Sequence, residues 1–145
     1  MNDPLLIAED LTRSYAAGRG GWFRKPPRFN AVDGVSLDVH RHETLGLVGE
    51  SGCGKSTLAR LLLGLTLPDT GRVLFDGHDI ATLDTPAWRA LRQRMQLVFQ
   101  DTGGALDPRL PIRVQVREAL EIHNLPGADP RTEAMLTQVR LGEHL

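Results

Sequence analysis

The chain has 145 residues, 41% of them hydrophobic and 24% charged, which is the composition of a globular protein with one modest core. Its 17 basic and 18 acidic residues balance, which argues against a surface that coats nucleic acid. A single cysteine excludes an intrachain disulfide framework, and the sequence has neither a signal-peptide pattern at its start nor a run of about 18 apolar residues, so we expect any membrane role to depend on a partner.

The first forty residues predict strands on either side of a basic loop. An apolar run at 5–8, continued at 11–15, favours one strand, and alternating apolar and polar residues at 35–40 favour another. Residues 11–32 contain no acidic residue but several arginines, glycines and prolines, which is typical of a solvated basic loop, with nucleic-acid contact as the alternative. Tyr15, the only tyrosine, is either a partly buried core aromatic or a face on which a purine ring stacks.

The stretch from residue 45 to residue 64 carries the strongest signal. An apolar run at 45–48 predicts a buried strand, and apolar residues at 58–63 predict a helix that ends at Gly64. The segment between them matches the pattern G-x-x-x-x-G-K-[ST], whose fixed positions are Gly49, Gly54, Lys55 and Ser56. Glycines leave room for backbone N–H groups to wrap around phosphate oxygens ahead of a helix N-terminus. The sequence therefore predicts a cradle for the phosphates of a nucleotide.

All residues of this segment are expected to line the phosphate site, and three of them have a more specific expected role. The predicted phosphate-binding residues are Gly49, Glu50, Ser51, Gly52, Cys53, Gly54, Lys55, Ser56 and Thr57. Lys55, one of two lysines in a chain with 15 arginines, is expected to reach the β- and γ-phosphates, and Ser56 to offer its hydroxyl to Mg²⁺. Cys53 is expected to be a small residue that fits a tight loop. Its place ahead of a helix N-terminus favours the thiolate, so bound nucleotide should slow its alkylation.

The second half predicts a hairpin, helices and one more strand. Residues 71–77 favour a strand that ends in an Asp-Gly turn, and Asp84 or Thr85 can cap a helix that buries Trp88, Leu91 and Met95. A buried strand at 97–99 should deliver Gln100 and Asp101 towards a phosphate site on a neighbouring strand. Two further helices are expected at 116–122 and 129–139, the latter with Asp129 and Pro130 as its cap and first position.

The order of these features resembles the nucleotide-binding domain of ABC transporters: Tyr15, then Gly49 to Thr57, then Leu97-Val-Phe-Gln100-Asp101. The sequence of residues 49–60, together with Ala31-Val-Asp-Gly-Val, is similar to that of the oligopeptide, dipeptide and nickel importer ATPases. The resemblance spans essentially the whole chain. The resemblance implies an α/β fold, with an antiparallel β subdomain and P-loop ATPase core over about 1–100 and the Q-loop and start of the helical subdomain over about 101–145.

The resemblance also implies the chemistry. ATP would bind with Mg²⁺, Tyr15 would stack on adenine, and Lys55 and Gln100 would be the catalytic residues, with Ser56 and Gln100 as metal ligands. The reaction would be hydrolysis of the γ-phosphate, driven by positioning and charge neutralisation.

Several family motifs have no counterpart in the sequence. No apolar run is followed by Asp-Glu as the Walker B motif requires, since Val73-Leu-Phe-Asp76 runs into Gly77. Residues 102–105 stand directly after Gln100, where the Leu-Ser-Gly-Gly-Gln signature does not belong, and the switch histidine is missing. We therefore expect a partial, truncated domain that is marginally stable by itself and does not hydrolyse ATP at a useful rate.

The implied setting is the cytoplasmic face of the plasma (inner) membrane, as a peripheral energy-coupling subunit of an importer for peptides or nickel. The implied partners are a second nucleotide-binding domain in a homo- or heterodimer, the permease subunits and, indirectly, an extracytoplasmic substrate-binding protein; nucleic acid is not expected. Alternatives stay open: a soluble ABC-type ATPase that acts on nucleic acid or ribosomes, supported only by the basic loop 13–28, a non-catalytic nucleotide-binding remnant, and a small-molecule kinase, which would not predict the Gln100 segment.

Overall fold

The computed structural model describes residues 3–18, 26–100 and 103–141. The chain divides into two compact units, Met1–Trp88 and Arg89–Leu145, which are taken separately below. In the described part of the chain, no helix combines the length and the apolar character that crossing a bilayer requires.

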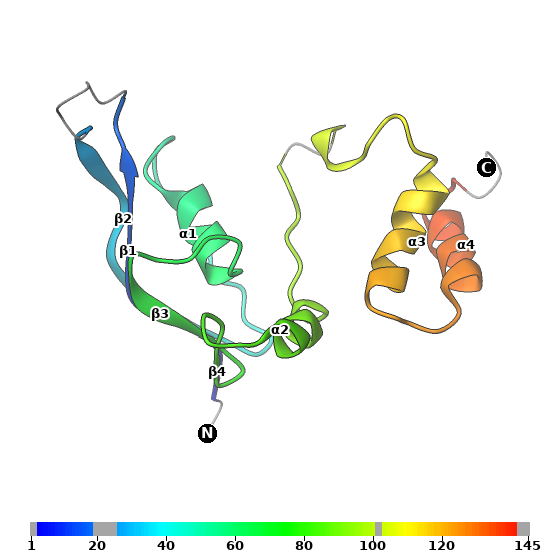
Figure 1. Ribbon diagram of the computed structural model, residues 1–145, viewed down its shortest axis with the longest axis horizontal. Coiled ribbons are helices and arrows are strands. Elements are labelled where there is room, and N and C mark those ends of the chain that lie inside the picture. The colour runs from blue at the N-terminus through cyan, green and yellow to red at the C-terminus, as the bar shows by residue number, and fades with distance from the viewer. Residues whose placement is uncertain (1–2, 19–25, 101–102, 142–145) are drawn as a thin grey trace. The chain divides into compact units, whose positions relative to one another are not determined.

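The first unit is built on an antiparallel sheet with the strand order β2-β1-β3-β4 (Figure 1). Its strands are β1 (Pro4–Ala16), β2 (Arg28–His40), β3 (Thr70–Phe75) and β4 (His78–Asp79). The predicted strands on either side of the basic loop are thereby confirmed, and β1 pairs with β2 as far as Ala16 opposite Arg28. The predicted turn is also confirmed: Asp76 and Gly77 both have positive φ and join Phe75 to its partner His78, as a two-residue hairpin loop requires.

Helix α1 (Lys55–Leu62) contacts β1 and β2 and closes the core of this unit. Leu58 and Leu61, three residues apart on one face of the helix, are buried together with apolar residues of the sheet, namely Ala8, Leu11, Val32, Val73 and Phe75. The helix is followed by Gly64, where an added Cβ would lie 2.5 Å from the Trp88 ring. Only glycine therefore permits Trp88 to pack so close to the end of α1.

Helix α2 (Thr85–Arg92) begins as predicted, because the Asp84 carboxylate accepts a hydrogen bond from Ala87 N at 2.9 Å and caps the helix. Trp88 and Leu91 lie within α2, whereas Met95 lies beyond its end.

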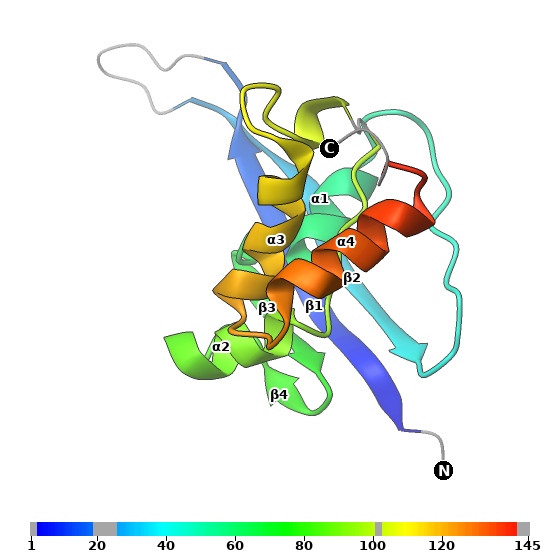
Figure 2. The same ribbon diagram turned by 90° about the vertical axis from the view of Figure 1, so that its right-hand side faces the viewer.

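The second unit contains the helices α3 (Ile112–Ile122) and α4 (Ala128–Gln138), preceded by a short 3₁₀ turn, η1 (Gly103–Ala105). Both views show α3 and α4 side by side (Figures 1 and 2). Ion pairs join Arg113 to Glu133 at 2.8 Å and Arg117 to Asp129 at 3.2 Å, a pairing that fits antiparallel helices. The predicted cap at Asp129 is wrong, because Gly127 is the cap. Asp129 lies in the first turn, where the helix dipole stabilises its carboxylate.

The two predicted buried strands at 45–48 and 97–99 are wrong. Neither segment has regular structure, and in the part of the chain that the structure describes no strand pairs with them. Without a ladder partner an apolar run cannot satisfy its backbone groups as a strand. Val48 is 95% exposed and Val98 84% exposed.

Candidate nucleotide-binding site

The glycine loop ahead of α1 is a tight turn that ends in a helix N-terminus. Cys53 N donates to Glu50 O at 3.3 Å, and Gly52 and Gly54 both adopt left-handed φ, +83° and +97°. Gly54 caps α1 without a side-chain hydrogen bond, and the first turn of the helix has no acidic residue. The N–H groups of this first turn have no acceptor within the helix, so they form a positive end at which an anion is stabilised.

Two of the glycines leave no room for a side chain. A Cβ on Gly49 would lie 2.7 Å from the Cys53 sulfur, and a Cβ on Gly54 would lie 2.0 Å from the carbonyl oxygen of Ala31 in β2. Gly52 has a positive φ but open space around the Cβ position. The loop thus folds back on itself at Gly49 and is pressed against the sheet at Gly54.

The Lys55 side chain returns over the loop instead of extending into solvent. Its ammonium donates to the carbonyl oxygens of Gly49 at 2.7 Å and Glu50 at 2.6 Å, and its nitrogen lies 3.5 Å from the Cys53 sulfur. The positive charge of Lys55 therefore lies over the loop. The N–H groups of the first turn of α1, which have no acceptor within the helix, follow directly after the loop. This arrangement suits a polyanion such as a triphosphate.

Ser56 and Thr57 occupy the first turn of α1, with Ser56 exposed and Thr57 half-buried. In the described part of the chain, no group of histidine, cysteine or acidic side chains is arranged to hold a metal ion by itself. The Ser56 hydroxyl can supply one oxygen ligand to Mg²⁺, a cation that keeps most of its coordination for water and phosphate oxygens. The loop therefore fits a Mg²⁺ that arrives with the nucleotide.

Tyr15 lies near the end of β1 and is half-buried. Its ring centroid is 6.2 Å from that of Phe29, its cross-strand neighbour, with the planes tilted by 39°. The guanidinium of Arg13 lies over the Tyr15 ring, 5.3 Å from its centroid. Neither Arg13 nor Phe29 is part of the sequence prediction for the site. Because side chains two residues apart share a face of a strand, the predicted continuation of the first strand over 11–15 already implied that Arg13 lies beside Tyr15.

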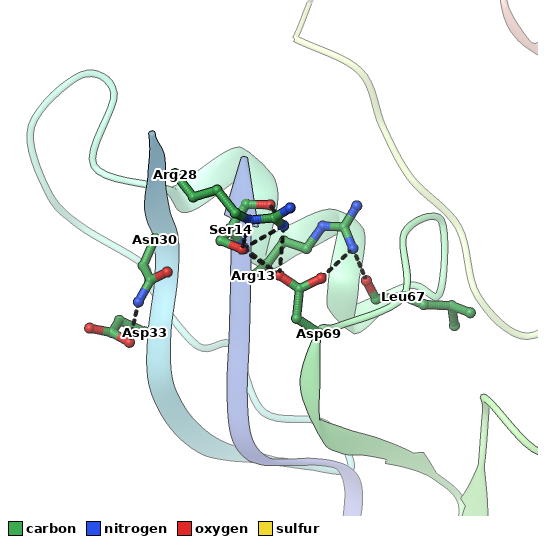
Figure 3. Close-up of polar contacts among 7 residues, drawn as sticks. All are labelled: Arg13, Ser14, Arg28, Asn30, Asp33, Leu67 and Asp69. Carbon is green, nitrogen blue, oxygen red and sulfur yellow. Dashed lines mark hydrogen bonds and ion pairs between the residues drawn. The ribbon is translucent and has the colours of Figure 1, made fainter. Parts of the chain in front are cut away.

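Arg13 is held by a polar cluster formed by residues of β1, β2 and the segment before β3 (Figure 3). Its Nη1 donates to Asp69 Oδ1 at 2.9 Å and to Leu67 O at 3.1 Å. The hydroxyl and the backbone N–H of Ser14 donate to Asp69 Oδ2 at 2.7 and 2.8 Å. These hydrogen bonds, with the charges of Arg13 and Arg28, hold the pKa of the Asp69 carboxyl below its usual range.

Gln100 belongs to the second unit. It is exposed and follows an irregular segment, and Asp101 lies outside the described residues. The structure thus places Gly49 to Thr57 in one loop and the first turn of α1, with Tyr15 in the same unit, while the role of Gln100 stays a prediction. The predicted basic loop over 11–32 is wrong at both ends, because residues 11–16 lie in β1 and 28–32 in β2, and Arg19, Arg24 and Lys25 lie outside the described residues.

Comparison with known proteins identifies relatives along most of the chain. The probable peptide ABC transporter ATP-binding protein y4tS of Sinorhizobium fredii is 51% identical over 122 residues, which cover 83% of this chain and 34% of that protein. The oligopeptide transport ATP-binding protein OppF of Salmonella typhimurium is 40% identical, with 95% of this chain and 42% of that protein covered. The dipeptide transport ATP-binding protein DppF of Escherichia coli is 38% identical, with 96% and 41% covered.

Solved structures agree on the fold. The ATP-binding cassette MJ0796, in a dimeric post-hydrolysis state bound to ADP and Pi, aligns with a TM-score of 0.68 at 24% identity, over 90% of this chain and 54% of that one. An ATP-binding subunit of an ABC transporter aligns with a TM-score of 0.67 at 26% identity, over 96% of this chain and 52% of that one. The predicted α/β fold class is thereby confirmed.

The chain spans well under half the length of these curated relatives, between 34% and 42%. Within that span the family model described as ABC transporter matches residues 32–144, from β2 to the end of the second unit. The chain therefore belongs to the ABC transporter family.

Proposed function

We propose that the chain is the phosphate- and base-binding part of the ATP-binding subunit of an ABC importer for peptides or nickel. The observation that carries this proposal is the position of the Lys55 ammonium, which lies 2.7 and 2.6 Å from the carbonyl oxygens of Gly49 and Glu50. These carbonyls belong to the loop that leads into the N-terminus of α1. The printed names of the relatives, peptide, oligopeptide and dipeptide transport ATP-binding proteins, support the transport role.

Nucleotide binding follows from the groups that the loop already presents. Lys55 exchanges its two carbonyl acceptors for oxygens of the β- and γ-phosphates, a charge-assisted contact that is stronger than the one it replaces. The N–H groups at the start of α1 donate to the same phosphates, and the Ser56 hydroxyl is offered to the accompanying Mg²⁺. Tyr15 supplies a ring on which adenine stacks.

In the whole transporter, hydrolysis of the γ-phosphate would be coupled to transport through Gln100, a second nucleotide-binding domain and the permease, at the cytoplasmic face of the membrane. We propose that residues 1–145 alone bind ATP but turn it over far more slowly than about 1 s⁻¹, the lower end of ordinary enzymes. The reason is chemical: the sequence has no acidic pair after an apolar run to polarise the attacking water.

The two lysines of the chain provide a matched experiment. Titration calorimetry with MgATP compares the wild type, Lys55→Ala, and Lys25→Ala as a control that removes the other lysine, in the basic loop. A charge-assisted hydrogen bond contributes roughly 1.5–3 kcal/mol, so Lys55→Ala should weaken binding by at least about tenfold while Lys25→Ala binds like the wild type. Equal affinities for the wild type and Lys55→Ala would remove the role of the loop.

The transport role has its own measurement. An affinity-tagged chain, expressed in a cell that carries a peptide or nickel permease, should fractionate with membranes and co-purify with that permease. Recovery with ribosomes or nucleic acid instead, and its loss on neutralising the basic loop, would favour the soluble ATPase alternative.

A further inference from the structure

Arg13 connects the Tyr15 ring to the segment that joins α1 to β3. One end of its guanidinium is fixed by Asp69 Oδ1 and Leu67 O, at 2.9 and 3.1 Å, and the group lies over the Tyr15 ring at 5.3 Å. Its Nε–H is buried without a hydrogen-bond acceptor in the described part of the chain, so packing fixes that side of the group. The Arg13 side chain is only 28% exposed, which is low for an arginine.

Asp69 is itself tied to both strands that carry the aromatic pair. It accepts from the hydroxyl and backbone N–H of Ser14 in β1, and the Ser14 hydroxyl accepts in turn from Nε and Nη2 of Arg28 in β2, at 3.0 and 2.7 Å. Arg28 also lies 3.6 Å from Asp69 Oδ2. Figure 3 shows these side chains converging on the one carboxylate. The position of Arg13 is thus determined from several directions at once.

We propose that Arg13, anchored by Asp69, is a positioning residue for base recognition, which holds one face of the Tyr15 ring so that the opposite face receives the base. The proposal rests on the proposed function, in which Tyr15 stacks on adenine. Arg13 does not touch the nucleotide in this role. It acts by fixing the platform before the base arrives.

The physical basis is preorganisation. A free aromatic side chain loses rotamer freedom when a base stacks on it, and that loss subtracts from affinity, whereas a ring already held by a cation and a neighbouring Phe29 has less to lose. Removing the cation should therefore weaken ATP binding by about two- to fivefold, the factor that corresponds to an exposed cation–π contact. Ligands without a base should be unaffected.

Inorganic tripolyphosphate provides the comparison, because it carries the phosphates without the base. Affinities for MgATP and for magnesium tripolyphosphate are measured on the full chain for the wild type, Tyr15→Ala, Arg13→Gln and Asp69→Asn. Arg72→Gln is the matched control: Arg72 also pairs with a carboxylate of the same sheet, Glu9 at 2.6 Å, and the same substitution removes that pair away from the aromatic cluster. Because Tyr15 is the only tyrosine, labelled tyrosine also gives a single set of ring NMR signals.

The expected result is a twofold to fivefold loss of ATP affinity in Arg13→Gln and Asp69→Asn, with tripolyphosphate affinity unchanged and altered Tyr15 ring signals. Arg72→Gln should leave both affinities at the wild-type value. An unchanged ratio of the two affinities in both variants, or an equal loss for both ligands, would overturn the proposal. If Tyr15→Ala leaves ATP affinity unchanged, or the wild type binds neither ligand, it is the proposed function that fails.

Discussion

Substituting the two left-handed glycines of the loop by alanine separates backbone strain from steric contact with the sheet. Both Gly52→Ala and Gly54→Ala force alanine into a left-handed conformation, which costs about 1–2 kcal/mol. At Gly52 nothing lies within 4 Å of the added Cβ, so no further cost is expected. At Gly54 the Cβ would lie 2.0 Å from Ala31 O, and relieving that overlap should add about 1–3 kcal/mol, as overpacking does elsewhere.

Hydrogen exchange at the Leu58 amide measures this difference, because Leu58 N donates to Gly54 O at 2.9 Å as the first helical hydrogen bond of α1. Each 1.4 kcal/mol corresponds to about a tenfold change in local opening, so Gly52→Ala should speed exchange by about 5- to 30-fold. Gly54→Ala should exchange at least several-fold faster still, while amides of α4 in the second unit stay unchanged. Equal exchange rates in the two variants would refute the contact between the loop and β2.

Three further outcomes concern the reactivity of the Cys53 thiol, the pH dependence of the Asp69 contribution to stability, and thermal unfolding of the chain. Saturating MgATP should slow alkylation of Cys53, which is exposed and 3.5 Å from Lys55 Nζ, and equal rates with and without nucleotide would argue against an occupied cradle. Because the pKa of Asp69 is lowered in the folded chain, its stabilising contribution is complete above the unfolded value of about 3.9 and lost as pH falls below it. The melting temperatures of the wild type and Asp69→Asn should therefore converge in acid, and a constant difference down to the lowest pH would contradict this. The isolated chain should melt broadly and aggregate on heating, and a sharp, reversible transition in calorimetry would contradict that expectation.

The features that the sequence predicted correctly depend on residues close together in the chain. The Asp76-Gly77 turn, the Asp84 cap and the glycines ahead of α1 each act over a few positions, so the pattern contains both partners of the interaction. The same locality explains why helix ends were less accurate. The cap of α4 is Gly127, which adopts a left-handed conformation and makes no side-chain hydrogen bond, so the Asp-Pro pattern placed the start of the helix too late.

The cluster around Arg13 could not be predicted in this way. Arg13 and Asp69 are 56 residues apart, and their ion pair exists because β1 lies between β2 and β3. Sequence alone presented Arg13 as one of several arginines of a basic segment and gave no role to Asp69. Only the sheet order reveals that they support Tyr15.

The apolar run at 45–48 leads into the phosphate-binding loop but does not form the predicted strand. Its composition favours a buried strand, but pairing decides whether a strand forms, and Leu45, Leu47 and Val48 stay exposed without a partner among the described residues. The loop that follows nevertheless keeps its turn, its left-handed glycines and its lysine contacts. The contacts of the loop are the hydrogen bonds from Lys55 to its carbonyl acceptors and the close approach of Gly54 to Ala31, and neither involves residues 45–48. Polar substitutions at 45–48 should accordingly change solubility more than affinity for phosphate.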